Sequence, residues 1–190
     1  MGRFFLLFIL VLAGYFNMFS RQAGSKDKTA LAGKPASATT VYLVRHAEKE
    51  TMNPNEEDPD LTAAGQKRAE DLKAYLQDVP LDAFFSTKYK RNQKTIAPLA
   101  QSHSIQFYEA HDFTNLRDRI LTDFKGKTVL VVAHSNTLLP IIEAFGAKKL
   151  VTQIGDNDYD NIFRIRIPGK GKATVQAKKF GVVNTQATKL

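Results

Sequence analysis

The distribution of apolar residues predicts a domain in which strands and helices alternate. Short runs rich in Val, Ile, Leu and Phe are typical of buried strands, and apolar residues at helical spacing occupy the segments between them. We expect strands at 41–44, 81–85, 105–108 and 128–133, then a hairpin of 162–167 and 173–180. We expect helices at 91–101, 114–124 and 137–145, and one capped by Thr62 whose apolar face is Ala69, Leu72, Tyr75 and Leu76.

The order of these elements indicates the fold class. Alternating strands and helices that end in a hairpin predict an α/β domain, a three-layer α/β/α sandwich with a largely parallel central sheet and a C-terminal antiparallel hairpin. Thr114 is predicted to cap the third helix, and Gly126 to stop it. We expect a single domain over residues 40–190.

The N-terminal segment differs from this pattern. Residues 4–19 are the longest apolar run, with Arg3 before it and Arg21 after it. The run is short for a membrane span of ~20 residues, but its positive flank and apolar core are typical of a signal peptide. We expect residues 1–24 to be a signal peptide or an N-terminal membrane anchor, and 25–39 a flexible linker. The protein would then be exported to the periplasm or the extracellular space, and a retained segment 4–19 would associate with the membrane.

Composition narrows the chemistry. The chain has no cysteine, which excludes disulfides, thiolate metal sites and a cysteine nucleophile. Lys and Arg number 27 against 19 Asp and Glu, a net charge of +8 that suits anionic partners. No basic motif is interleaved with aromatic residues, so nucleic acid is not an expected partner.

Polar residues that suit phosphate follow three of the predicted strands. The first strand ends in Arg45 and His46, the second precedes Arg91, and the fourth ends in 134–136, which is His-Ser-Asn. Ligands of open α/β sheets bind beyond the carboxyl ends of the strands. The planar arginine fork matches phosphate oxygens, and histidine can donate a hydrogen bond or attack phosphorus. The spacing therefore predicts a phosphate-binding pocket at this edge.

Four segments carry a resemblance to a known family. Residues 44–48 (VRHAE) resemble the R-H-G-E signature of the histidine phosphatase superfamily, also called phosphoglycerate mutase-like. The chain also resembles three further motifs of that superfamily, in the same order, at residues 61–69, 85–97 and 131–136 (VVAHSN). Ala47 stands where the family usually has glycine, and the Gln and Thr after Arg91 are spaced more loosely than in some members. The resemblance is to a small, single-domain branch.

The resemblance implies a mechanism and a set of roles. His46 would be the nucleophile and would form a phosphohistidine that water hydrolyses. Arg45, Arg91 and His134 would hold the phosphate oxygens, with Ser135 and Asn136 as further phosphate ligands. Neither a metal ion nor another cofactor is implied.

The general acid is left open by the sequence. Glu109 follows the third strand and is the preferred candidate for protonating the leaving oxygen, with Asp112 and Glu48 as alternatives. A branch without a dedicated acid would favour good leaving groups, as in phosphohistidine or an acyl phosphate. His103 and His111 lie outside the motifs, and we interpret both as ordinary surface or packing residues.

These observations favour a phosphatase acting on a small phosphorylated substrate or on a phosphohistidine protein. A mutase of the phosphoglycerate type is disfavoured, because mutases need long insertions and this domain has about 150 residues. A non-catalytic phosphate-binding envelope module is the third alternative. It predicts the loss of one of Arg45, His46, Arg91 or His134, and all four are present.

Overall fold

The computed structural model describes residues 37–101 and 103–181. No helix among these residues is long and apolar enough to cross a membrane. The segment predicted as signal peptide or anchor lies outside the described residues, as does the predicted linker up to residue 36. The first strand begins at Thr39, so the end of the predicted linker is already part of the domain.

Six strands and four helices alternate as predicted. Their order along the chain is β1 (Thr39–Arg45), α1 (Ala63–Leu76), β2 (Ala83–Ser86), α2 (Lys90–Ala100), β3 (Ile105–Phe107), α3 (Phe113–Asp123), β4 (Thr128–Ala133), α4 (Leu138–Ala144), β5 (Asn161–Ile167) and β6 (Thr174–Lys179).

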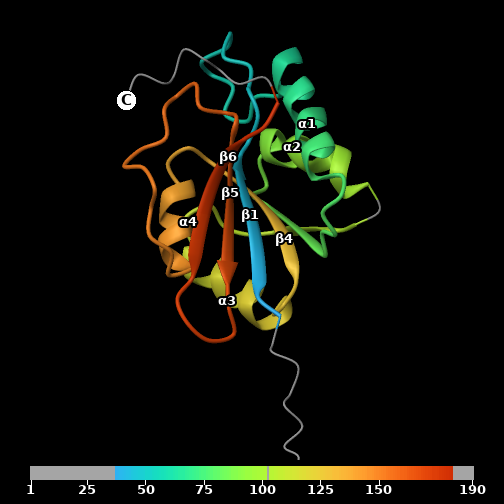
Figure 1. Ribbon diagram of the computed structural model, residues 1–190. Coiled ribbons are helices and arrows are strands. Elements are labelled where there is room, and N and C mark those ends of the chain that lie inside the picture. Colours follow the sequence, from blue (N-terminus) through green and yellow to red (C-terminus); the bar gives the residue numbers. More distant parts are fainter. Residues whose placement is uncertain (1–36, 102, 182–190) are drawn as a thin grey trace, which may run out of the picture. The chain divides into compact units, whose positions relative to one another are not determined.

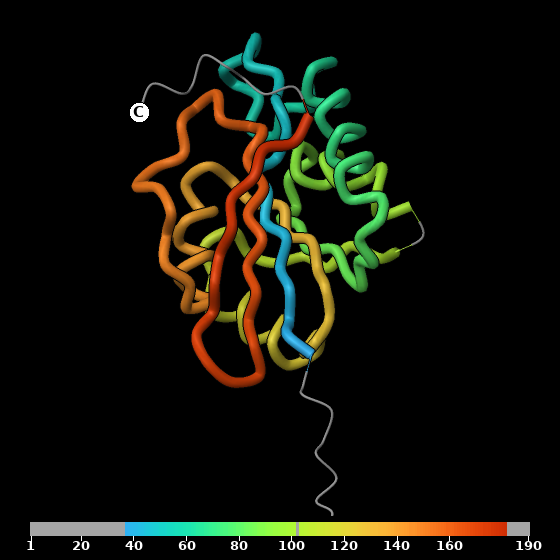
Figure 2. Tube along the Cα trace, in the orientation of Figure 1, coloured from blue at the N-terminus to red at the C-terminus, as the bar shows by residue number. Residues whose placement is uncertain are grey.

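The strands form one sheet in the order β3-β2-β4-β1-β5-β6 (Figure 1). The first four strands in this order are mutually parallel. Strand β5 runs antiparallel to β1 and forms the expected antiparallel hairpin with β6. The first and fifth strands therefore lie side by side although they are far apart in the sequence (Figure 2). The predicted fold class is confirmed.

Helices cover both faces of the sheet. Leu43, Phe85 and Val131 point to the face packed by α3 and α4, whereas their neighbours Val44 and Phe84 point to the face packed by α1 and α2. Because both faces are covered, the inner strands are apolar without a polar alternation, as in other parallel sheets. Their carboxyl ends therefore carry the polar groups that reach solvent.

The start of α1 depends on a close approach between backbones. The Thr62 hydroxyl accepts a hydrogen bond from the Gly65 N–H at 3.0 Å, which confirms the predicted cap. A Cβ atom on Gly65 would lie 2.2 Å from the carbonyl oxygen of Glu48. Only glycine lets the helix begin this close to the segment that follows β1.

Three details of the predicted helices are wrong. Tyr75 is 39% exposed and is not part of the apolar face of α1, which buries Gly65 instead. Helix α3 is capped by Asp112, whose carboxylate accepts a hydrogen bond from the Asn115 N–H at 3.0 Å, and not by Thr114. Asp112 and Thr114 are both residue types that cap helices well, so propensity did not separate them. Helix α4 is also shorter than predicted, at Leu138–Ala144.

Candidate active site

The carboxyl ends of β2, β4 and β1, which are neighbours in the sheet, bring the predicted phosphate ligands together. Arg45 ends β1, His46 follows it, His134 follows β4, and Arg91 lies in the first turn of α2. All four line a cavity of about 340 Å³. Its other lining residues are Lys49, Tyr89, Ala110, His111, Ser135 and Asn136. Ser135 and Asn136, which the sequence predicts as further phosphate ligands, thus line the same cavity.

His46 is held in one tautomer. Its Nδ1 lies 2.8 Å from the carbonyl oxygen of Ala47, which can only accept a hydrogen bond. Nδ1 therefore carries the proton, and Nε2 keeps a lone pair. Burial lowers the pKa of His46 to about 3, and the charge of Arg45 adds to the effect. The imidazole is neutral at pH 7 and can act as a nucleophile.

His134 faces His46 across the pocket. The two ring centroids are 5.4 Å apart, and Nε2 of His134 lies 3.2 Å from the Thr87 hydroxyl. Burial lowers the pKa of His134 to about 4, and the positive charge of Arg91 contributes. A phosphate dianion in the pocket would oppose this shift and favour the protonated ring, which donates hydrogen bonds from both nitrogens.

Arg45 is anchored on one side. Its Nη1 donates hydrogen bonds to the carbonyl oxygens of Gly155 at 3.1 Å and Asp156 at 2.7 Å. The guanidinium carbon lies 4.0 Å from the ring centroid of Tyr159, whose hydroxyl is 3.4 Å from Nη2. Nε is buried and makes no hydrogen bond to any described residue. A ligand anion is the natural partner for such a buried donor.

Arg91 makes fewer polar contacts with the described residues than Arg45. Its guanidinium carbon lies 4.1 Å from the centroid of the Tyr89 ring, and Nη1 lies 3.6 Å from a carboxylate oxygen of Asp58. Nε and Nη1 are buried, and neither makes a hydrogen bond within the part of the chain that the structure describes. Burial lowers the pKa of Arg91, and the charge of Asp58 opposes the shift. Nε and Nη1 of the planar guanidinium group are thus available to bind phosphate oxygens.

A hydrogen-bonded link fixes the nucleophile relative to Arg91. The Ala47 N–H donates to the Thr95 hydroxyl at 2.9 Å, and that hydroxyl donates to the carbonyl of Arg91 at 2.7 Å. Asn92 donates from the same helix to the carbonyl of Val132 on β4 at 3.2 Å. Within the described residues, positive φ occurs only at glycines, so Ala47 fits the turn that usually holds glycine.

Glu48 makes an ion pair outside the cavity. Its carboxylate pairs with Arg68 of α1, with Nε 2.8 and 2.9 Å from the two oxygens. Glu48 is also not among the residues that line the cavity of His46. The structure therefore does not favour Glu48 as the alternative acid.

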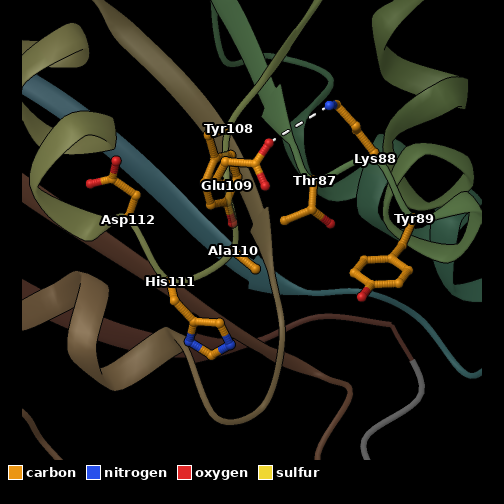
Figure 3. Close-up of a pocket in the computed structure, with 8 residues that line it drawn as sticks. All are labelled: Thr87, Lys88, Tyr89, Tyr108, Glu109, Ala110, His111 and Asp112. Atoms are coloured by element: carbon orange, nitrogen blue, oxygen red, sulfur yellow. Dashed lines mark ion pairs between the residues drawn. The ribbon is translucent and has the colours of Figure 1, made fainter.

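The other two candidate acids lie beside a second, larger cavity of about 720 Å³ (Figure 3). The Glu109 carboxylate is 3.7 Å from Nζ of Lys88, and both side chains are more than three-quarters exposed. The Asp112 carboxylate caps α3. Neither residue lines the cavity that contains His46.

Three aromatic side chains of the site were not predicted. Tyr89 and Tyr159 stack on the two arginines, and His111 lines the cavity of His46. His111 is exposed and packs against Phe113, in agreement with its interpretation as a surface or packing residue, but its place at the cavity was not foreseen. Its position soon after a predicted strand end was the available signal, whereas Tyr159 precedes the hairpin and gave none.

Comparisons with known proteins indicate the family and the fold of the chain. The family model of the histidine phosphatase superfamily (branch 1) matches residues 41–128. No curated protein matches the chain in sequence.

Solved structures share the fold. A protein from Nakamurella multipartitia described as the phosphohistidine phosphatase SixA is 19% identical, with a TM-score of 0.59 over 78% of this chain and 100% of that chain. The protein histidine phosphatase SixA complexed with tungstate is 15% identical, with a TM-score of 0.61 over 74% of this chain and 96% of that chain.

A phosphoglycerate mutase from Bacillus anthracis is 16% identical, with a TM-score of 0.56 over 76% of this chain and 94% of that chain. Identities this low establish a shared fold and leave the substrate open. The resemblance seen in the four motifs is nevertheless confirmed by the family match and by the fold. The segment of residues 41–128, which contains Arg45, His46 and Arg91, matches the histidine phosphatase superfamily (branch 1), and the solved structures that share the fold are described as phosphatases and as a phosphoglycerate mutase.

Proposed function

We propose that this protein is a metal-independent phosphatase that hydrolyses a phosphoester or a phosphohistidine through a phosphohistidine intermediate on His46. The observation that carries the proposal is the hydrogen bond from Nδ1 of His46 to the Ala47 carbonyl, which leaves a nucleophilic Nε2 in the cavity of Arg45, Arg91 and His134. A neutral imidazole beside two guanidinium groups that have hydrogen-bond donors without partners among the described residues suits in-line attack on a bound phosphate.

In the first step, the Nε2 lone pair of His46 forms a bond to phosphorus. The bond from phosphorus to the leaving oxygen breaks, and its electron pair stays on that oxygen, which takes up a proton. Arg45 and Arg91 neutralise charge on the three remaining oxygens, and His134 donates a hydrogen bond to one of them. These groups are positioned before substrate binds, so little reorganisation opposes the reaction.

In the second step, the oxygen of a water molecule attacks phosphorus on the opposite side from Nε2. The P–N bond breaks, and its electrons return to Nε2 of His46. The water gives up a proton, inorganic phosphate is released, and the neutral imidazole is restored. A mutase would instead return the phosphoryl group to an alcohol of the substrate.

The test compares the full-length wild type with His46→Ala, using p-nitrophenyl phosphate. We expect phosphate release by the wild type, an acid-labile phosphoenzyme in rapid-quench samples, and loss of both in His46→Ala. His103→Ala is the matched control, because His103 is exposed and lies before β3, away from this cavity. Equal hydrolysis by the wild type and His46→Ala, or none by either, would refute the phosphatase. Transfer to an added acceptor with little free phosphate would support the mutase.

Export remains a prediction of the sequence. Cell fractionation of the full chain and of a chain lacking residues 1–24 tests it, with the full chain expected outside the cytoplasm and the shortened chain inside it.

A further inference from the structure

Two cavities meet at the active site. The smaller one holds His46 and its phosphate ligands, and the larger one opens at the carboxyl ends of β2 and β3. Both are lined by Tyr89, Ala110 and His111. A substrate whose phosphate occupies the smaller cavity would therefore place the rest of the molecule along the larger one, and its leaving oxygen near the three shared residues.

His111 is the only one of these shared residues that carries an imidazole, whose nitrogens can donate and accept protons. Its imidazole points away from the carboxylates of Glu109 and Asp112 (Figure 3). The ring is supported on one side by Phe113, at 6.1 Å between centroids. His111 and His134 both line the smaller cavity, and the charge of His111 is one of the minor causes that lower the pKa of His134.

The carboxylates that could compete for the proton-donor role are engaged elsewhere. Glu109 lies against Lys88 in the larger cavity, and Asp112 caps α3. Glu48 is paired with Arg68. A general acid must reach the leaving oxygen of a phosphate bound to His46. Among the candidate acids and His111, only His111 lines the cavity that holds His46.

We propose that His111 is the general acid of this site and that the larger cavity receives the leaving group. The inference rests on the proposed phosphatase activity. As the P–O bond breaks, the imidazolium of His111 gives its proton to the leaving oxygen, while Nε2 of His46 forms the P–N bond. In the second step, neutral His111 takes a proton from the attacking water. The P–N bond then breaks, and both histidines return to their starting states.

This assignment narrows the substrate class. An alkoxide is a poor leaving group, so an alcohol ester of phosphate needs a proton donor, whereas p-nitrophenolate leaves without one. Lys88 and Glu109 give the larger cavity charges of both signs at its surface. The buried Tyr108, whose hydroxyl donates to the Val132 carbonyl at 2.9 Å, forms a rigid wall. We infer that the substrate is a phosphate monoester of a polar alcohol.

The experiment measures kcat/KM for the full-length wild type, His111→Ala and Glu109→Gln on p-nitrophenyl phosphate and on phenyl phosphate. In His111→Ala we expect a loss of about 100-fold or more on phenyl phosphate and of less than about 5-fold on p-nitrophenyl phosphate. Retained activity on p-nitrophenyl phosphate also shows that the variant is folded. His103→Ala is the control.

Two results would overturn the assignment. The first is a change of kcat/KM in His111→Ala that is the same on both substrates, including no change at all. The second is a loss of kcat/KM that depends on the leaving group in Glu109→Gln but not in His111→Ala. Either can occur while the phosphatase proposal stands, because that proposal depends on phosphoenzyme formation by the wild type and its absence in His46→Ala. The two failures are therefore distinguishable.

Discussion

The two sides of the active site are built differently. At the end of β1, Arg45 and His46 are 6% and 4% exposed, and each is held by hydrogen bonds to backbone carbonyls. In the segment after β3, the Glu109 side chain is 79% exposed, and it pairs with the equally exposed side chain of Lys88. Burial on the first side lowers the pKa of two histidines and leaves arginine donors unpaired.

This difference fits the proposed reaction. Phosphate is the same in every substrate, and stabilising its transition state needs dipoles and charges that do not reorganise. The leaving group differs between substrates, and exposed side chains on a connecting segment can vary without disturbing the core. The ends of β1 and β4, here called the phosphate side, are part of the buried structure of the domain. The segment after β3, here called the leaving-group side, lies on its surface.

The largest contrast is expected between Arg91 and Lys88. Arg91→Ala removes unpaired, buried donors aimed at the phosphate, and we expect kcat/KM on p-nitrophenyl phosphate to fall about 100- to 1,000-fold. Lys88→Ala removes an exposed charge from the other side, and a loss below about 10-fold is expected. Arg91→Lys keeps the charge but not the fork and is expected to fall between them. Equal losses in Arg91→Ala and Lys88→Ala would remove the distinction between the two sides.

The buried histidines should make folding stability depend on pH. The folded rings have pKa values of about 3 and about 4, whereas an unfolded histidine titrates near pH 6.5, so the unfolded chain binds more protons between these values. The free energy of unfolding should therefore fall as the pH drops from 6.5 toward 4, by up to ~1.4 kcal/mol per pH unit for each ring. Urea unfolding at several pH values measures this slope. His134→Asn should flatten it, and an unchanged slope would contradict the assigned neutral state.

The link from Ala47 to Thr95 tests how far the phosphate side belongs to the fold. Thr95→Val removes the acceptor of a buried N–H, and we expect the free energy of unfolding to drop by about 1–3 kcal/mol. Thr95→Ser keeps the hydroxyl and should lose less. Chemical denaturation gives both values. A Thr95→Val protein as stable as Thr95→Ser would show that the link does not hold the nucleophile turn.

The smallest effect on phosphate binding is expected for Asp58, in the acidic loop of residues 53–60. Asp58 accepts hydrogen bonds from the Lys90 N–H at 3.0 and 3.2 Å and lies 3.6 Å from Arg91, whereas Asp60 pairs with Lys94. Asp58→Asn keeps an acceptor for the Lys90 N–H and removes a negative charge near Arg91. Inorganic phosphate should then inhibit at a concentration about 3-fold lower.

Asp60→Asn is the matched control for this loop, because its partner lies outside the lining of the cavity. The inhibition constant of phosphate should stay at the wild-type value in Asp60→Asn. A weaker inhibition in Asp58→Asn would mean that its carboxylate orients Arg91 more than it competes with the ligand.

The elements that the sequence predicted best are those with a purely local cause. Strand β4 has the predicted bounds because a continuous apolar run suits a strand buried on both faces. The Thr62 cap was predicted from side-chain type and confirmed. The cap of α3 was missed because Asp112 and Thr114 are similar in propensity, and the packing of α3 on the sheet decided between them.

The candidate site divides in the same way. Motifs at three strand ends were enough to bring Arg45, His46, Arg91 and His134 together, because parallel strands end at the same edge. The acid was not predictable, because residues 109–112 carry three titratable side chains and the spacing does not say which one faces the phosphate. Their partners, Lys88 and the start of α3, come from the folded chain.

The sequence by itself determined the fold class, the similarity to the superfamily and the residues that line the candidate site, because all three depend on periodicity and on motifs within short segments. Only the tertiary structure decided the tautomer of His46, the anchoring of Arg45 and the place of His111. These depend on burial and on contacts between distant segments, such as the hydrogen bond between Arg45 and Gly155, 110 residues apart. Burial arises only when the elements pack together. The pKa values of His46 and His134 are therefore determined by how the sheet and its loops enclose them.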